Sequence, residues 1–350
     1  MSAKKLTKSG HGVELRKTLQ DVARVAEVHY TTVSRSLRDD PQISEKTRKR
    51  VKAIAKKMGY EPDPMLQALA RYRMREHTES FHGTLAWLIN IPEASDHNAE
   101  TRRADFETSN EWASHKGYRF EPFNLADPAL SPERIFRIIA SRGIRGILLP
   151  PQKKPGTRLK LDFSGFSVVT IGNTLAAPDL HRVSPAQYEN AYLLSRHLLE
   201  SPDLRVGLYL PAMIDRRTNG RISSAFWRAQ QDMPKERRIP IHLPEDYDED
   251  DFRAWMTRYP MDVLIATPQP SIEWLGRMNL RIPEDIRVAS PTGNTEAETS
   301  YWIEEEWDEI YRSAVDFLIS QIERNLTGVP ATPRRITLRG SLKQSNHSKV

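Results

Sequence analysis

The sequence contains no cysteine among its 350 residues. This absence excludes disulfide frameworks, cysteine-based metal sites and a thiol nucleophile, and it fits a reducing cytoplasm. Long apolar runs are also missing, because no segment reaches the roughly 18 uninterrupted apolar residues that a membrane helix needs. The first 17 residues are basic and no apolar run follows them, so we expect no secretory signal.

Motifs of catalysis are absent as well. The ten histidines are scattered without an HExxH pair, and there is no GxSxG elbow, no phosphate-binding loop and no GxGxxG after an expected strand. The acidic run at 304–309 has a metal-like composition, but a helix start favoured by the helix dipole explains it better. We therefore expect no enzyme activity, no metal site and no cofactor.

Charge is unevenly distributed along the chain. Residues 1–75 hold 18 Lys and Arg against 8 Asp and Glu, whereas the rest of the chain holds 34 against 38. The basic excess therefore lies wholly in the first fifth of the sequence. Such an excess indicates a polyanionic partner for that part alone, although a solvated basic tail is an alternative interpretation.

Residues 1–17 are polar and lack periodicity, which is typical of a disordered basic arm. Beyond them, helical spacing predicts three short helices with a shared core. Ser44 is expected to cap the third helix and Gly59 to end it. The expected core residues are Leu19, Val22, Ala23 and Ala26 of the first helix, Val33 and Leu37 of the second, and Val51, Ile54, Ala55 and Met58 of the third.

From about Phe81 the pattern changes to alternating strands and helices. This alternation predicts parallel sheets covered by helices, with enough elements for two lobes. Strands are expected at 84–91, 146–149, 167–171, 206–210, 262–266 and 287–289. Helices are expected at 102–116, 132–141, 185–200, 219–231, 250–257, 271–278 and 308–325.

Residues 18–63 resemble the headpiece of the LacI (lactose-repressor/galactose-repressor) family. The segment carries DVA from Asp21, TVSR from Thr32, SEKTRKRV from Ser44 and GYEP from Gly59. The body is similar to that family's sensor in the order and length of its elements. The resemblance implies an all-α helix-turn-helix headpiece, followed by an α/β, two-lobed, periplasmic-binding-protein-like sensor domain with parallel sheets.

The same resemblance implies a division of the chain. After the arm come a DNA-binding domain at 18–62, a hinge helix and linker at 63–80, and an effector-binding and dimerisation domain at 81–345. Within the last, the N-lobe is expected at about 81–183 and 303–326, and the C-lobe at about 184–302 and 327–345.

In a helix-turn-helix the second helix lies in the major groove, and its first residues contact base edges. This places Tyr30, Thr31 and Arg35 toward the bases, with Arg35 suited to a bidentate contact with guanine. The alternative interpretation is that these three side chains only lie on the exposed surface of a helix and read no bases. Residues suited to phosphate contacts are Thr18, Thr32, Ser34, Arg38, Thr47 and Tyr60.

The resemblance also implies a hinge helix whose leucine wedges into the minor groove at the operator centre. The matching residue is Leu69, with the small residues Ala68 and Ala70 beside it; an amphipathic linker that packs on the sensor is the alternative. One headpiece reads only a half-site, so a homodimer on a near-palindromic operator is expected.

Two headpiece positions depart from the family pattern. Glu27 stands where a glycine is usual in the turn, and His29 stands where a small polar cap is usual. Glu27 lacks the tolerance of glycine for a positive φ and adds negative charge near DNA. Neither change should prevent folding, but the operator is expected to be unusual.

The effector site implied by the resemblance involves Arg221, Asn90 and Thr292. Thr292 occupies the place of a ligand-binding aspartate, and Pro268-Gln269 occupies that of an Asn-Asp pair. A buried aspartate is the usual partner of sugar hydroxyls, so these departures put a simple sugar ligand in doubt.

The sequence thus predicts a cytoplasmic, dimeric, sequence-specific DNA-binding transcription regulator, with repression expected over activation. Its partners would be a double-stranded DNA operator and a small-molecule effector, a sugar or another metabolite, with no membrane association. Two alternatives stay open. One is a DNA-binding regulator whose sensor no longer binds a sugar and responds to a protein or other ligand. The other is a soluble solute-binding protein.

Overall fold

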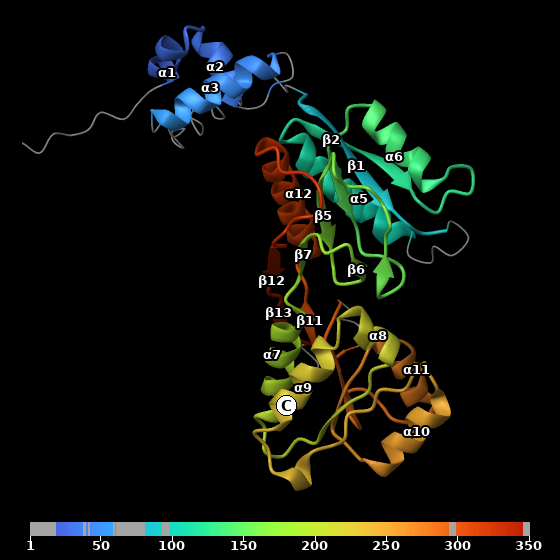
Figure 1. Cartoon of the computed structure of the whole chain (residues 1–350). Coiled ribbons are helices and arrows are strands. Elements are labelled where there is room, and N and C mark those ends of the chain that lie inside the picture. Colours follow the sequence, from blue (N-terminus) through green and yellow to red (C-terminus); the bar gives the residue numbers. More distant parts are fainter. Residues whose placement is uncertain are drawn as a thin grey trace, which may run out of the picture. The chain divides into compact units, whose positions relative to one another are not determined.

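The computed structural model describes residues 19–37, 40, 43–58, 60, 81–92, 99–293 and 299–345. The chain divides into two compact units, Met1–Ser80 and Phe81–Val350, which are described separately (Figure 1). The expected basic arm at 1–17 lies outside the described residues, as does the hinge and linker at 63–80.

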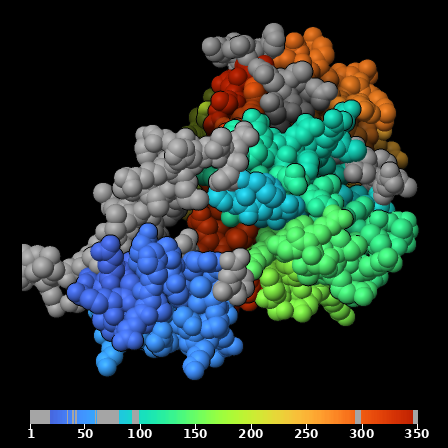
Figure 2. Space-filling view, turned by 90° about the horizontal axis from the view of Figure 1, so that it is seen from above, coloured from blue at the N-terminus to red at the C-terminus, as the bar shows by residue number. Residues whose placement is uncertain are grey.

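The first unit, shown in blue in Figures 1 and 2, contains three helices around a small core. They are α1 (Leu19–Ala26), α2 (Tyr30–Leu37) and α3 (Glu45–Lys57). The helices are too short to be stable alone, so their apolar faces must be buried against one another. The predicted core is confirmed: Val22, Ala23, Ala26, Val33, Val51 and Ala55 are buried, and Leu19, Leu37, Ile54 and Met58 pack against them.

Local sequence signals set the helix boundaries in this unit. Ser44 Oγ accepts a hydrogen bond from the Thr47 backbone N–H at 3.3 Å, so the predicted cap of α3 is confirmed. Between α1 and α2, Glu27 has a φ of 49°, a left-handed conformation that glycine adopts more readily than glutamate. The departure at position 27 therefore places a strained residue in the turn.

Replacing Glu27 by glycine should stabilise the headpiece by about 1 kcal/mol, because glycine has no Cβ to oppose the left-handed backbone. The measurement is amide hydrogen exchange of α1 and α2, which reports the local free energy of unfolding. E27A is the matched control, since it removes the same charge and keeps a Cβ. Equal protection in E27G and E27A would contradict the assignment of strain.

The second unit has two lobes, each built on its own sheet. The six-stranded sheet of the first lobe has the order β12-β7-β5-β3-β1-β2, and all its pairs are parallel. Its strands are β1 (Gly83–Ile89), β2 (Tyr118–Asn124), β3 (Gly146–Leu149), β5 (Ser167–Ile171), β7 (His181–Pro185) and β12 (Arg335–Leu338). Its helices are α5 (Ala99–Ser114), α6 (Pro132–Ser141) and α12 (Trp307–Glu323), and β4 (Thr157–Arg158) pairs with β6 (Leu175–Ala177) in a small separate sheet.

The five-stranded sheet of the second lobe has the order β13-β11-β10-β9-β8, with only the β11–β13 pair antiparallel. Its strands are β8 (Val206–Leu208), β9 (Val263–Ile265), β10 (Arg287–Ser290), β11 (Tyr301–Glu304) and β13 (Ser341–Gln344). Its helices are α7 (Gln187–Leu199), α8 (Ala212–Arg217), α9 (Arg221–Gln230), α10 (Glu249–Arg258) and α11 (Pro268–Arg277). The predicted two-lobed α/β fold with parallel sheets is thus confirmed.

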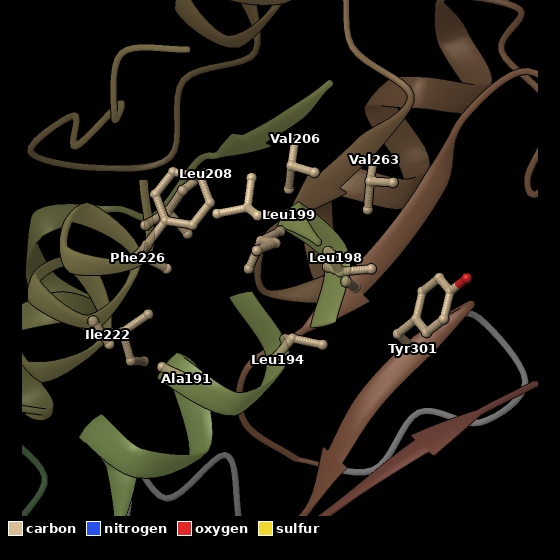
Figure 3. Close-up of a cluster of buried hydrophobic side chains, with 14 of the residues drawn as sticks. Ala191, Leu194, Leu198, Leu199, Val206, Leu208, Ile222, Phe226, Val263 and Tyr301 are labelled. Carbon is tan, nitrogen blue, oxygen red and sulfur yellow. The ribbon is translucent and has the colours of Figure 1, made fainter. Parts of the chain in front are cut away.

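The second lobe illustrates how these sheets are stabilised. Side chains of α7 and α9 meet those of β8 and β9 in one buried cluster, part of which is shown in Figure 3. Leu194 and Leu198 of α7 and Phe226 of α9 are almost completely buried there. Each such side chain contributes roughly 1.5–3 kcal/mol by leaving water.

The lobe boundaries differ from those that the sequence predicted. β12 was expected in the C-lobe, but it pairs with β7 in the sheet of the first lobe. Residues 303–304 were expected in the N-lobe, but they belong to β11 in the other sheet. The apolar pattern could not reveal this exchange, because short strands of either lobe look alike in sequence.

Three segments carry the chain between the lobes: 185–187, 304–307 and 338–341. Asn190, near the start of α7, accepts a hydrogen bond from the Gly340 N–H at 2.9 Å and so joins the first of these crossings to the third. Position 340 requires glycine, since a Cβ there would lie 2.5 Å from the Glu304 carbonyl oxygen. In the second crossing the buried Glu305 accepts a hydrogen bond from the Trp307 indole N–H at 3.1 Å.

Candidate functional site

His29 precedes helix α2, and its backbone carbonyl oxygen accepts the first hydrogen bonds of that helix. The His29 carbonyl oxygen accepts hydrogen bonds from the N–H groups of Thr32 and Val33, at 2.9 and 3.2 Å. The His29 ring Nδ1 lies 2.8 Å from Thr31 Oγ1. Histidine therefore caps this helix in place of the small polar residue that the resemblance implied.

The first turns of α2 have one buried and one outward side. Val33 and Ser36 are fully buried against the other helices. Tyr30 is 49% exposed, Thr31 is exposed, and the Arg35 side chain is 38% exposed. The three residues predicted to read bases are thus on the solvent-facing side of the helix, and their contact with DNA stays a prediction.

Arg35 is held by an acidic partner that sequence reasoning did not identify. Its Nε donates a hydrogen bond to Asp40 Oδ2 at 2.8 Å, and the Asp40 N–H donates to the Arg35 carbonyl oxygen at 3.0 Å. Asp40 lies in the connection between α2 and α3. Because a charge-assisted bond to Nε restrains the plane of the guanidinium group, Asp40 acts as a positioning residue for Arg35.

The residues predicted to contact phosphates have varied surroundings. Thr32 and Thr47 are partly buried, and Thr47 Oγ1 lies 2.8 Å from Ser44 Oγ within the cap of α3. Tyr60 packs against the headpiece core. Ser34 lies on α2. Thr18, Arg38, Ala68, Leu69 and Ala70 lie outside the described residues.

The outer face of α3 is strongly basic. Five of its cationic side chains are exposed, namely Lys46, Lys49, Arg50, Lys56 and Lys57. Lys49 forms an ion pair with Glu45 at 2.7 Å. This face supplies the positive potential that attracts a polyanion without reading its sequence.

The predicted effector residues lie at the ends of structural elements in both lobes. Asn90 follows β1, Thr292 follows β10 and Arg221 opens α9, and all three are partly buried. Arg221 Nη1 donates to the Thr218 carbonyl oxygen at 3.0 Å. The carboxyl ends of parallel strands are the usual ligand-binding edge of α/β domains, but contact of these residues with a ligand stays a prediction.

Two further residues near Arg221 were not identified from the sequence. Asp215 of α8 is buried and accepts hydrogen bonds from the N–H and Oγ of Ser223, at 3.3 and 2.7 Å, which joins α8 to the first turn of α9. Arg217 Nη1 donates to the Lys153 carbonyl oxygen at 2.7 Å. Lys153 follows β3, so this hydrogen bond joins the two lobes.

No helix in the described part of the chain has the length and apolar character needed to cross a bilayer. Within the same residues, His, Asp and Glu side chains form no group of three or more that could hold a metal ion.

Comparison with known proteins identifies the headpiece. Residues 18–63, which include all three helices and the exposed turn of α2, match the family model of bacterial regulatory proteins, lacI family. Residues 18–63 therefore carry a headpiece of the LacI type. The expectation drawn from the sequence is thus confirmed for the headpiece by the family model and for the body by the two-lobed fold.

Curated LacI-family relatives are similar over most of the chain. A match over 294 residues is 23% identical to the HTH-type transcriptional repressor PurR of Escherichia coli O139:H28 and covers 77% of this chain and 79% of that protein. The PurR repressor of Escherichia fergusonii is 24% identical over the same length, with the same coverage.

Solved structures share the fold at lower sequence identity. A lac repressor dimer bound to operator and the anti-inducer ONPF has a TM-score of 0.53 and 16% identity, covering 94% of this chain and 98% of that chain. The complex of the transcriptional regulator CelR with cellobiose has a TM-score of 0.52 and 18% identity, with the same coverage. The headpiece match and the PurR relatives support a DNA-binding transcription regulator of the LacI type, and the solved structures share its two-lobed fold.

Proposed function

We propose that this LacI-family regulator is a cytoplasmic repressor that binds a near-palindromic operator as a homodimer. The observation that carries this proposal is the outward-facing start of α2, where Tyr30, Thr31 and Arg35 are accessible while Val33 and Ser36 are buried. A two-fold dimer presents two such turns to two half-sites of a duplex. The lac repressor dimer on its operator and the PurR repressors support this assignment.

Within each half-site, Arg35 donates to a guanine and Tyr30 and Thr31 contact neighbouring base edges. Phosphate contacts, which set register rather than sequence, come from Thr18, Thr32, Ser34, Arg38, Thr47 and Tyr60. Leu69, flanked by Ala68 and Ala70, enters the minor groove at the operator centre.

The body serves as the sensor and the dimerisation domain. A small-molecule effector binds where the two lobes meet, at Arg221, Asn90 and Thr292, and its differential affinity for two lobe arrangements changes operator affinity. A carbohydrate is one candidate, supported by the CelR–cellobiose complex. The second candidate is a sensor that no longer binds a sugar, which the threonine at 292 and Pro268-Gln269 favour. We infer no catalytic role.

Genomic pulldown of the full-length protein, followed by DNase footprinting of the recovered fragments, tests the DNA-binding part of this proposal. The expected result is a small set of discrete protected sites, each with two related half-sites. Diffuse protection that depends only on salt concentration would contradict sequence-specific binding by a dimer.

A further inference from the structure

Three arginines of the described residues lie at the junction of the lobes and have no acidic hydrogen-bond partner there. Neighbouring Arg216 is different, because it is exposed and its guanidinium group lies 3.0 Å from the Glu245 carboxylate. Arg182, Arg217 and Arg221, which we call the interlobe arginines, instead donate only to backbone carbonyl groups.

Arg182 is a buried strand residue that is 7% exposed. Its Nη atoms donate to the carbonyl oxygens of Gly172 and Leu175, at 2.8 and 2.7 Å, in the segment that follows β5. Burial and the positive charges of Arg335 and Arg221 together lower the pKa of Arg182 to about 10, although Asp179 offsets part of their effect. The carbonyl groups therefore orient Arg182 without neutralising it.

Hydrogen bonds link Arg182 of the first lobe to the arginines of the second. Between Gly172 and Leu175, whose carbonyl groups Arg182 binds, Thr174 Oγ1 accepts a hydrogen bond from the Gln152 N–H at 2.6 Å. The adjoining Lys153 carbonyl group accepts from Arg217, and Arg221 donates to Thr218, the residue after Arg217. Two acidic side chains in these segments have other hydrogen-bond partners: Asp179 forms an ion pair with Arg335, and Asp215 accepts two hydrogen bonds from Ser223. The junction thus has a surplus of positive charge.

Arg217 adds a third charge at the contact between the lobes. It is only partly exposed, burial lowers its pKa, and its one hydrogen bond reaches across to the Lys153 carbonyl oxygen. Partly buried guanidinium groups that lie together without a counter-charge repel one another, and this repulsion costs free energy. An anionic ligand would remove that cost, so the site is suited to bind one. Guanidinium groups bind carboxylate and phosphate in a planar, bidentate manner.

We infer that the effector carries an anionic group, a carboxylate or a phosphate, which Arg217 and Arg221 bind from the second lobe while Arg182 contributes its charge from the first. This inference rests on the proposed effector site at the lobe junction. It also accounts for the departures at 268, 269 and 292, because a site for an anion does not need the acidic side chains that hold sugar hydroxyl groups.

Isothermal titration calorimetry of the full-length protein with matched ligand pairs tests the inference. The pairs are glucose and glucose 6-phosphate, ribose and ribose 5-phosphate, and glucose and gluconate, all at one ionic strength, so that the phosphate and carboxylate arms are separate. At least one anion should bind, with its neutral counterpart weaker by about tenfold or more. Binding of none of the anions at millimolar concentration, or equal binding of a neutral partner, would overturn it.

Variants locate the site. R217A and R221A should each weaken the anion by about ten- to hundredfold, because each removes charge-assisted hydrogen bonds. R217K keeps the charge without the planar donors and should lose part of the affinity. R216A is the matched control and should bind as the wild type does; an equal loss in R216A would contradict the assignment.

DNA binding, measured with fragments from the genomic pulldown, distinguishes failure of the proposed ligand class from failure of the proposed function. If the operator is bound and no anion is, the ligand class is wrong and the regulator assignment stands. If anions bind and no specific DNA does, the ligand class stands and the proposed function fails.

Discussion

Replacing Arg35 by alanine is expected to lower operator affinity by roughly thirtyfold or more. One bidentate arginine–guanine contact contributes about 1–3 kcal/mol of discrimination, and a symmetric dimer loses two of them. Affinity for unrelated DNA should change little, since the exposed lysines of α3 and the other cations of the headpiece supply that term. Fluorescence anisotropy with operator and scrambled duplexes measures both quantities at fixed salt.

The ion pair between Arg35 and Asp40 allows a second test of base reading by Arg35. D40N should retain the arginine but relax its orientation, because it removes the charge-assisted bond at 2.8 Å to Arg35 Nε. Specific affinity should therefore fall less in D40N than in R35A, while loss of a negative charge raises non-specific affinity slightly. The ratio of specific to non-specific affinity falls in both variants.

R24A is the matched control for R35A. Arg24 lies on α1 of the same headpiece and also pairs with an acid, at 2.8 Å from Asp21, but its side chain is 79% exposed. Its removal should lower specific and non-specific affinity by the same small factor. If R24A lost operator affinity as selectively as R35A does, base reading by α2 would be refuted.

The second large effect concerns Glu305, which lies in a crossing between the lobes. Burial raises the pKa of this carboxyl to about 7, and hydrogen bonds from Trp307 and Asn190 offset only part of that effect. The folded protein therefore keeps this proton between about pH 4.5 and pH 7, where the unfolded chain has released it. Glu305 should make the protein less stable as pH rises through this window, by about 3 kcal/mol when the loss is complete above pH 7.

E305Q mimics the protonated carboxyl at every pH. The variant should be about as stable as the wild type near pH 4.5 and increasingly more stable as the pH approaches and passes 7. Chemical denaturation across this range measures the difference in unfolding free energy between the two proteins, in which the other titrating groups largely cancel. A difference that does not change with pH would show that Glu305 is ionised in the folded protein throughout.

E304Q is the matched control for this experiment. Glu304 also accepts an indole N–H hydrogen bond at 3.1 Å, from Trp302, but it is more exposed than Glu305. Because the proposed effect arises from burial, E304Q should leave the pH dependence of stability as it is in the wild type.

Elements with sharp local signals could be predicted from the sequence to the residue. Helix α6 runs from Pro132 to Ser141 as expected, because Ser131 caps it and Pro132 suits its first turn. β3 and β5 are short, fully buried strands rich in apolar residues and were also predicted to the residue. β2 and β7 were missed, since β2 is an edge strand of mixed polarity and β7 begins with His181 followed by a buried arginine, Arg182.

The candidate site, too, could be predicted from the sequence only in part. The outward position of Tyr30 and Arg35 follows from helical periodicity and the headpiece motif, both of which are local in sequence. Asp40 could not be assigned as the partner of Arg35, because the pair forms only when the connection after α2 turns back. The bond from Arg217 to the Lys153 carbonyl group depends on the contact of two lobes, which no spacing in the sequence encodes.

The central claim, that the start of α2 reads bases twice in a symmetric dimer, is tested most directly by selecting bound duplexes from a random-sequence pool with wild type and R35A in parallel. The wild type should recover a near-palindrome with a defined guanine in each half-site, and R35A should recover the same arms with that position degenerate. An unchanged consensus in R35A, or a wild-type consensus without two-fold symmetry, would contradict the claim.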